Sequence, residues 1–335
     1  MNYPDFLVYI DCITYNHASY IEDAMNGFCM QETTFPFVAA IIDDASTDGE
    51  QNVIKRYLEE NFDFSEKAVA RKWETYDAYF IYAQHKTNKN CYFAVVLLKY
   101  NFYQLKKDKT PLISEWRNIA KYVAFCEGDD YWTKKEKLQT QVDFLEQNLN
   151  YSMCFHKANK LYEIECNNFI KCEEIENRDY SGKELLEDWT VPTASIVCRT
   201  EIFTYKTKGD NRILNGDIII VLKCSEFGKL RGLSDFMSVY RINENSITNN
   251  VKIQKDRYLK FPEHYEFIFD NFHSIKSKKI KRIMGEIFLE RAKNKTFYTK
   301  SWYYDMMKSL KYTPTITAKY LIVMSWNHIK RKIGF

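Results

Sequence analysis

The stretch at residues 122–132, YVAFCEGDDYW, places three carboxylates directly after an apolar run. Such a run of aromatic and aliphatic residues is typical of a buried parallel strand, and Glu127, Asp129 and Asp130 follow its carboxyl end. Open α/β sheets bind their ligands at that end of the strands. Carboxylates this close repel one another unless a cation shares the site. The alternative is a solvated acidic loop before the next helix, because acidic side chains are mostly exposed.

Two earlier strand-like runs, at residues 6–14 and 38–42, also end in polar residues. A stretch with helical spacing of its apolar residues follows each run, at 19–30 and 51–61. This alternation predicts an α/β protein with a mostly parallel sheet flanked by helices. The polar side chains at the strand ends are then expected to meet at one edge of the sheet; they are Thr14, Tyr15, Asn16, Asp43, Asp44 and Ser46.

The rest of the chain is less regular. Residues 63–118 are rich in lysine and tyrosine and favour a long, irregular insertion over the site, with strand-like stretches inside it. Thr133 and Glu136 form a capping-box pattern that predicts a helix start. After residue 249 the pattern becomes helical and basic. We therefore expect one α/β domain at residues 1–249 and a helical basic region at 250–335.

The charge of the chain is unevenly distributed, although the formal net charge is only +3. Residues 251–335 hold 19 lysines and arginines against 7 acidic residues. A basic segment favours an anionic partner, but the acidic remainder of the chain argues against a broad nucleic-acid footprint, so no nucleic-acid partner is expected. Residues 316–335 interleave apolar and basic side chains, which suits either a membrane interface or an amphipathic helix packed on the protein.

Cysteine usage and hydropathy indicate a cytoplasmic protein. The nine cysteines are odd in number and include no CxxC pair, a pattern typical of reduced thiols. The sequence shows no signal-peptide pattern at its start and no run of about 18 apolar residues that would span a membrane. Peripheral contact with the inner face of the cell membrane, through the basic C-terminal region, is a further expectation.

Several common catalytic motifs are missing from the sequence. It contains no glycine-rich phosphate loop, no GxSxG elbow and no HxxxH pair. Carboxylates at strand ends remain as the convergent chemistry, together with Asp217 before an apolar helix start. Such a set suits a nucleotide diphosphate bound through a divalent metal, because hard cations take carboxylate and phosphate oxygens.

Four blocks of the chain, taken together, resemble family 2 glycosyltransferases of the GT-A fold, of the type found in bacterial surface-polysaccharide synthesis. The blocks span about 240 residues, and the second and third are the specific ones. They are CITYNHASYIEDAM (12–25), FVAAIIDDASTDG (37–49), YVAFCEGDDYWTKKEKLQTQVDFL (122–145) and FMSVYRINENSIT (236–248).

The resemblance implies a nucleotide-sugar site in the first half of the chain. Asp44 matches the aspartate that hydrogen-bonds the base, and Glu127 and Asp129 occupy the two acidic positions of the family's DXD motif. Asp129 would ligate a Mn²⁺ or Mg²⁺ ion on the donor's diphosphate, with Asp130 assisting, and Arg241 would help to hold that diphosphate. The remaining matched nucleotide-sugar positions are Thr14, Tyr15, Asn16, Asp43 and Ser46.

The resemblance also implies the chemistry. Asp217 matches the catalytic base, which takes the proton of the acceptor hydroxyl as that oxygen attacks and inverts the anomeric carbon. The family has Glu before this base, whereas this chain has Gly216. Trp132 and Trp189 could form a stacking wall for sugar. The implied function is transfer from a nucleotide-diphosphate sugar, with UDP expected, to a glycan or lipid-linked glycan acceptor.

Other interpretations remain open at this point. The chain could be a non-catalytic nucleotide-sugar-binding relative, or a nucleotidyltransferase, although the latter lacks its glycine- and lysine-rich phosphate loop. Asp217 could be a helix N-cap, Tyr15 and Trp132 plain core aromatics, and Arg241 a solvated strand-end charge.

Overall fold

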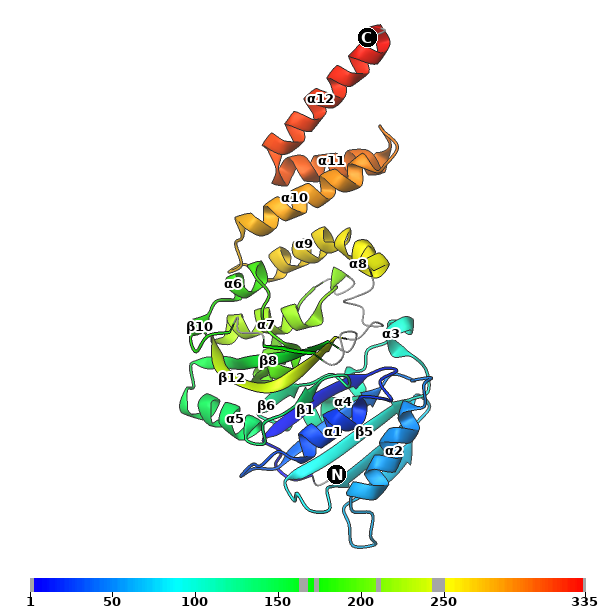
Figure 1. Ribbon diagram of the computed structural model, residues 1–335, viewed down its shortest axis with the longest axis vertical. Helices are drawn as coiled ribbons and strands as arrows, with labels where there is room; N and C mark the ends of the chain where they lie inside the picture. The colour runs from blue at the N-terminus through cyan, green and yellow to red at the C-terminus, as the bar shows by residue number, and fades with distance from the viewer. Residues whose placement is uncertain (1–2, 163–167, 172–174, 209–211, 243–250, 334–335) are drawn as a thin grey trace. The chain divides into compact units, whose positions relative to one another are not determined.

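A computed structural model gives the fold of the chain (Figure 1). The residues that it describes are 3–162, 168–171, 175–208, 212–242 and 251–333. The chain forms two compact units. The first consists of Met1–Leu185, Trp189–Tyr205 and Ile220–Glu244, and the second of Leu186–Asp188, Lys206–Ile219 and Asn245–Phe335.

A mixed sheet of twelve strands forms the centre of the first unit, and its main path runs β10-β12-β8-β11-β6-β1-β2-β5-β4-β3. Four neighbouring strands, β6, β1, β2 and β5, are parallel, so their carboxyl ends lie at one edge. The strands are β1 (Val8–Thr14), β2 (Phe37–Asp43), β3 (Arg71–Glu74), β4 (Ala78–Gln84), β5 (Cys91–Leu98), β6 (Tyr122–Phe125), β7 (Tyr131–Trp132), β8 (Tyr151–Tyr162), β9 (Asn168–Lys171), β10 (Asp179–Tyr180), β11 (Val197–Arg199) and β12 (Lys229–Ile242).

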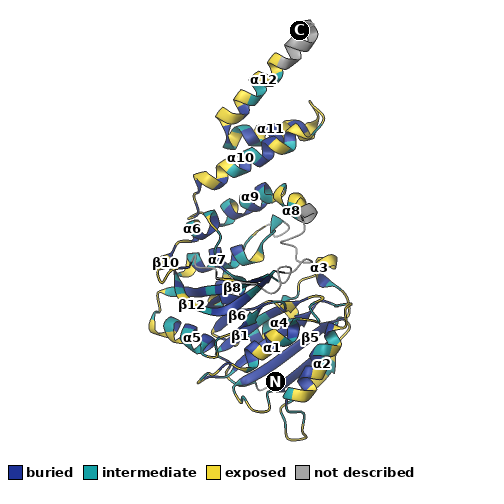
Figure 2. Cartoon of the chain, viewed as in Figure 1, coloured by how far each residue is buried: buried dark blue, intermediate teal, exposed yellow. Residues whose placement is uncertain are grey.

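The parallel strands are buried because helices cover both faces of the sheet (Figure 2). One face packs against α1 (Ile21–Cys29), α2 (Glu50–Asn61) and α5 (Lys137–Gln147). The other packs against α4 (Thr110–Arg117) and the short α3 (Phe102–Leu105). Strands covered on both sides read as continuous apolar runs, and this confirms the predicted α/β fold class.

Part of the expected insertion belongs to the core sheet instead. Strand β5 pairs in parallel with all of β2, and every residue of β5 is buried. Strand β4 adds to β5 in antiparallel orientation. The continuous apolar sequence of β5 is that of a central strand, whereas its lysine- and tyrosine-rich surroundings favoured an irregular segment.

One strand departs from a simple parallel series on this side of the sheet. Strand β11 lies antiparallel between β6 and β8, and β8 and β12 are parallel to each other.

The capping box expected at Thr133 is not formed, because α5 begins at Lys137 and its N-cap residue Glu136 makes no side-chain capping bond. Between β10 and β11 the chain forms α6 (Gly182–Glu187) and a 3-10 turn, Thr193–Ser195. A second 3-10 turn, Thr200–Thr204, follows β11.

The second unit is helical. Its helices are α8 (Val251–Tyr258), α9 (Phe261–Asn271), α10 (Lys278–Lys293), α11 (Lys300–Tyr312) and α12 (Pro314–Ile333), and it also contains the start of α7 (Gly216–Phe227). Helices α10 and α11 pack closely because Gly285 leaves room for Thr313. A Cβ at Gly285 would lie 2.4 Å from Thr313 Oγ1, so only glycine fits at this position. Within the described residues, no helix has the length and apolar character needed to cross a bilayer.

Candidate functional site

The ends of β1, β2 and β6 are fastened together by backbone hydrogen bonds. Thr14 pairs with Asp43 in the parallel register, and the amide of Asp44 donates to the Thr14 carbonyl at 3.0 Å. The amide of Gly128 donates to the Ile13 carbonyl at 3.1 Å. The structure therefore brings the three polar loops predicted from the sequence to one edge of the sheet.

The loop after β1 and the loop after β2 interlock through their side chains. Asn16 and Ala45 both adopt positive φ, at 58° and 61°, which turns each loop sharply. The Asn16 amide donates to Ser46 Oγ at 2.9 Å, and the amide of Thr47 donates back to Asn16 Oδ1 at 2.8 Å. Tyr15 is exposed beside this junction. The two loops thus form one interlocked rim, on which Tyr15 is exposed.

Glu50, at the start of α2, holds the two loops of this rim together through hydrogen bonds. It was not identified by the sequence analysis. Its side chain is fully buried, and Oε1 accepts a hydrogen bond from Thr14 Oγ1. Its Oε2 accepts from the His17 amide and from Ser46 Oγ, both at 2.8 Å. Burial raises the pKa of Glu50, while these hydrogen bonds lower it. A single glutamate after DDASTDG carries no motif signal, so only the fold reveals its role.

The acidic loop after β6 lies directly on Thr14. A Cβ at Gly128 would meet Thr14 Oγ1 at 2.1 Å, so only glycine fits between Glu127 and Asp129. Glu127 is exposed, and Asp129 is partly exposed. Asp129 Oδ2 lies 3.7 Å from Nε2 of His17. The loop therefore brings the Asp129 carboxylate to His17 of the rim and leaves Glu127 exposed beside it.

Asp130 is placed differently from its two neighbours. It is almost fully buried, and its Oδ1 accepts a hydrogen bond from the Arg241 amide of β12 at 2.9 Å. Burial, followed by the nearby charge of Asp129, raises the pKa of Asp130 well above its usual value. This position favours a structural role that fastens the acidic loop to β12, rather than the metal-ligand role expected from the sequence.

The Arg241 guanidinium is also held by the protein. Its Nη2 donates to Asp23 Oδ2 at 2.8 Å, and its plane lies over the rings of Tyr20 and Tyr131 at 4.5 and 5.2 Å. Arg241 is buried to 5% exposure, so it is not the solvated charge of the alternative interpretation. It fixes a positive charge next to the acidic loop.

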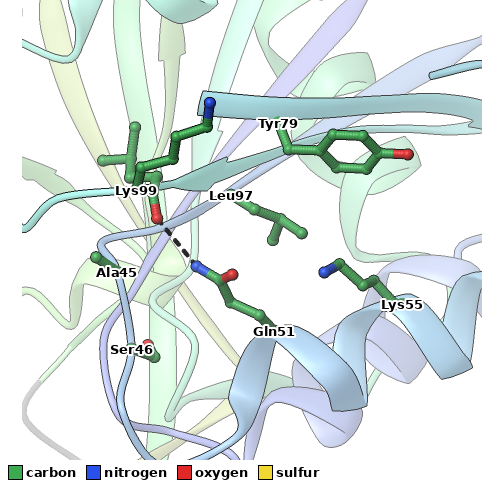
Figure 3. A pocket seen from close by; sticks show the side chains of 8 residues that line it. Ala45, Ser46, Gln51, Lys55, Tyr79, Leu97 and Lys99 are labelled. Carbon is green, nitrogen blue, oxygen red and sulfur yellow. Dashed lines mark hydrogen bonds between the residues drawn. The ribbon is translucent and has the colours of Figure 1, made fainter. Parts of the chain in front are cut away.

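Asp43 faces inward, toward α2. Its Oδ1 accepts from the Ser46 amide at 3.1 Å, and burial raises its pKa. Gln51 of α2 donates to Asp43. It also donates to the Leu98 carbonyl, the bond that is dashed in Figure 3. Behind this contact lies a cavity of about 360 Å³ that Lys55 and Tyr79 also line (Figure 3). In this position Asp43 supports the turn after β2.

Asp44 is engaged by the segment that follows β5. Its Oδ1 accepts from the Phe102 amide at 2.7 Å and its Oδ2 from the Tyr103 amide at 3.1 Å, which caps the short helix α3. Lys109 Nζ lies 2.9 Å from the same Oδ2. The aspartate expected to bind a base is thus 2% exposed and fully hydrogen-bonded. A base could reach it only if α3 or Lys109 moved.

The predicted tryptophan wall is not formed by Trp132. That ring is 2% exposed, packs edge-on against Phe28 and donates from Nε1 to the Ala194 carbonyl at 2.9 Å. Lys137 Nζ lies over it at 3.9 Å. Trp132 is a core residue, because β7 turns it under the sheet edge. Trp189 is partly buried against the hydrophobic core of the first unit.

Asp217 belongs to the second unit, whereas the strand-end residues belong to the first. It lies in the first turn of α7, where Oδ1 accepts from the Ile218 amide at 2.8 Å. Burial raises the pKa of Asp217, and hydrogen bonding partly offsets this. Asp217 therefore lies inside the first turn of α7 and not at its N-cap position, and its bond to the next amide differs from that of an N-cap residue, which accepts two or three residues further on. A raised pKa is what a general base uses.

The donor atoms at the acidic loop fit a divalent cation that brings further ligands with it. Among the residues that the structure describes, no three or more His, Cys, Asp or Glu side chains are arranged to hold a metal alone. Glu127 is exposed and Asp129 partly exposed on this loop, and His17 Nε2 lies 3.7 Å from Asp129 Oδ2. Mg²⁺ in phosphate sites is bound through one or two carboxylates and completes its shell with phosphate and water. The carboxylates of the acidic loop suit such a site.

No protein-family model matches the chain. In sequence it is similar to uncharacterized proteins of Mycobacterium tuberculosis and Mycobacterium bovis, each 28% identical over 280 residues, which cover 82% of this chain and 71% of theirs.

Solved structures show the same architecture. The chain is similar to Staphylococcus aureus TarS 1–349 in complex with UDP-GlcNAc, with a TM-score of 0.55 and 15% identity, over 92% of this chain and 82% of that one. The complex of the same protein with UDP gives a TM-score of 0.52 and 14% identity over the same shares. At this identity the likeness concerns the fold, which this chain shares with TarS.

Proposed function

We propose that the chain is an inverting, metal-dependent glycosyltransferase that transfers a sugar from a nucleotide diphosphate, with UDP as the expected nucleotide, to a glycan or lipid-linked glycan acceptor. The observation that carries the proposal is the convergence of Tyr15, Asn16, Glu127 and Asp129 at the carboxyl edge of a sheet with the fold of TarS. TarS was crystallised with UDP-GlcNAc and with UDP.

Each residue has a proposed role that its position supports. Tyr15 stacks on the base, and the rim of Thr14, Asn16 and Ser46 holds the nucleoside. Asp129 ligates the divalent cation, which neutralises charge on the leaving diphosphate when bound. Because Asp44 accepts hydrogen bonds from the first amides of α3 and pairs with Lys109, base recognition by Asp44 requires this segment to rearrange on binding.

The remaining two roles concern the diphosphate and the acceptor. Arg241 stabilises the diphosphate as a fixed buried charge, since Asp23 and two tyrosine rings already hold its guanidinium in place. Asp217 is the proposed base for the acceptor hydroxyl, and its raised pKa makes it a stronger base than an exposed aspartate.

Calorimetric titration of UDP, with and without Mn²⁺, tests the donor site. We expect wild type to bind UDP only with the metal, and Asp129→Asn to lose that metal dependence because it removes a charged ligand. Asp143→Asn, on the exposed side of α5, is the matched control and should bind as wild type does. Absence of nucleotide binding under every condition would overturn the proposal.

Turnover by Asp217→Asn separates catalysis from binding. We expect this variant to bind UDP within a few-fold of wild type while losing transfer or donor hydrolysis by at least ~10²-fold, the range of general-base contributions. A wild type that binds UDP-sugars, turns none over and is indifferent to Asp217→Asn would instead identify a non-catalytic nucleotide-sugar-binding protein.

We also propose that α12 contacts an anionic membrane surface, where a lipid-linked acceptor would be presented. Its side away from Thr317 and Leu321 exposes Ile322 and Val323, at 69% and 57%, near the exposed Lys319. Apolar side chains beside a cation suit the boundary between headgroups and acyl chains.

Flotation with vesicles tests this contact. Wild type should float with phosphatidylglycerol vesicles and not with phosphatidylcholine alone, and Ile322→Asp with Val323→Asp should abolish flotation. Equal flotation of wild type and the double variant would exclude this surface.

A further inference from the structure

His17 connects the buried support of the rim to the acidic loop. Its Nδ1 lies 3.2 Å from Thr14 Oγ1, and its Nε2 lies 3.7 Å from Asp129 Oδ2. Thr14 Oγ1 in turn donates to the buried Glu50. A continuous path of polar groups therefore runs from α2, under the rim, to the carboxylate that faces the donor site.

The hydroxyl of Thr14 determines where the proton of His17 lies. A hydroxyl has one proton to donate, and Thr14 Oγ1 donates it to Glu50 Oε1. Glu50 accepts two further hydrogen bonds, from the His17 amide and Ser46 Oγ, both on Oε2. With its proton directed to Glu50, Thr14 Oγ1 accepts from His17 Nδ1–H. In the neutral ring, the lone pair of His17 is on Nε2, the atom that faces Asp129.

This is the arrangement that metal-binding histidines use. Such a residue donates from its other ring nitrogen to an acceptor that fixes the tautomer and the orientation of the ring. Here the acceptor is Thr14, and Glu50 fixes Thr14. Gly128 presses the acidic loop onto Thr14, so the two donor atoms, on His17 and Asp129, are positioned by the same hydroxyl.

We propose that His17 is a second protein ligand, through Nε2, of the divalent cation that Asp129 binds in the proposed donor site. The inference rests on the proposed function for the identity of the remaining ligands, which are diphosphate oxygens and water. Thr14 and Glu50 act as positioning residues. A nitrogen ligand favours Mn²⁺ or Co²⁺ over Mg²⁺, because Mg²⁺ takes oxygen ligands almost alone.

Pulsed electron paramagnetic resonance of Mn²⁺ bound to the full-length protein tests the ligand directly. We expect modulation from a directly coordinated ¹⁴N nucleus in wild type and its loss in His17→Gln. His273→Gln, an exposed histidine of the second unit, is the control and should keep the signal. Bound Mn²⁺ without nitrogen coupling in wild type would overturn the inference.

The same samples distinguish the inference from the proposed function. If UDP tightens Mn²⁺ binding but no nitrogen coupling appears, the donor site stands and the role of His17 fails. If nitrogen coupling appears but UDP changes neither the spectrum nor the affinity, the metal site stands and the nucleotide proposal fails. Absence of Mn²⁺ binding, with or without UDP, overturns both.

The positioning residues have a readout of their own. Long-range ¹H–¹⁵N correlation spectra of the metal-free protein at pH 8 should show His17 as the Nδ1–H tautomer, with His17→Gln assigning the signal. Thr14→Val keeps the shape of the side chain and removes the acceptor, so it should release this tautomer preference and weaken Mn²⁺ binding by about 10–100-fold. An Nε2–H tautomer in the wild type would contradict the proposed path.

Discussion

Gly128 and Thr14 are in such close contact that a Cβ on the glycine would lie 2.1 Å from the threonine hydroxyl oxygen and 2.6 Å from its Cβ. Thr14 is 1% exposed and also held by Glu50, so it has no room to withdraw. The glycine between Glu127 and Asp129 is therefore required by a contact between the ends of β1 and β6. These two strand ends are more than 100 residues apart in the sequence.

Gly128→Ala should destabilise the protein and displace Asp129. We expect the free energy of unfolding to fall by about 1–3 kcal/mol, the usual cost of overpacking, with weaker metal-dependent UDP binding. Urea denaturation and calorimetry measure the two effects. Gly216→Ala is the matched control, because a Cβ there meets nothing within 4 Å. Unchanged stability of Gly128→Ala would mean that the loop does not press on Thr14.

Cys29 should react far faster with alkylating agents than the fully buried cysteines. Burial raises its pKa, but hydrogen bonds from Cys91 and His85 outweigh this and bring the pKa to about 6. The rate of carbamidomethylation at Cys29, followed by mass spectrometry, should therefore have its midpoint near pH 6 and already be at its plateau at pH 8.

His85→Gln should raise the midpoint for Cys29, since it removes one of the stabilising hydrogen bonds. Cys126 is the internal control, because burial raises its pKa well above the usual value. A midpoint above pH 8 for Cys29 in wild type would contradict the arrangement.

Lys137 should make stability depend on pH. Burial lowers its pKa to about 7, whereas the pKa of a lysine in the unfolded chain is about 10.4. Between these values the unfolded state binds one more proton, so this residue makes the free energy of unfolding rise with pH, by ~1.4 kcal/mol per pH unit. Below pH 7 both states are protonated and this contribution stays constant.

Lys137→Met should remove that slope. We expect the difference in unfolding free energy between the variant and wild type to favour the variant most at pH 7 and below, and to shrink by pH 10. Denaturant titrations at three pH values measure it. A difference that does not change with pH would show that Lys137 titrates normally in the folded protein.

Lys109→Met should loosen the segment that covers Asp44. The ion pair is mostly buried, with side-chain exposures of 18% and 3%, so its loss should cost about 1–3 kcal/mol of stability. Lys107→Met removes a more exposed pair with Asp77 and should cost less than ~1 kcal/mol. Hydrogen exchange of the Phe102 and Tyr103 amides should rise in Lys109→Met alone. Equal protection in the two variants would contradict the difference in burial.

The sequence predicts the elements whose signal is local. The apolar runs of β1, β2 and β6 and the polar residues after them follow the strand-end rule, so the meeting of Thr14, Ser46 and Asp129 could be expected. Strand β5 could not be placed with the same ease, because its buried run lies inside a lysine- and tyrosine-rich segment and is followed by Lys99 and Tyr100 rather than by a carboxylate.

The missed or altered residues depend on contacts that no local pattern encodes. Glu50 acts only because three loops meet above it, and Asp44 is engaged by amides 58 and 59 positions later in the chain. Tryptophan is a residue type that often stacks on sugars, but the two-residue strand β7 turns Trp132 into the core. These are tertiary effects, and they explain why motif positions were easier to predict than the partners of each side chain.

The second unit takes a stretch from the middle of the chain, Lys206–Ile219, and this has a practical consequence for dividing the protein into parts. Arg212 pairs with Asp270 at 2.9 Å, Leu214 donates to His264 at 3.3 Å, and Asn271 binds both the amide and the carbonyl of Lys208. A truncation after residue 244 would keep one half of every such pair and discard the other. Expression of the sheet unit by itself therefore calls for replacing this stretch with a short linker as well as shortening the chain.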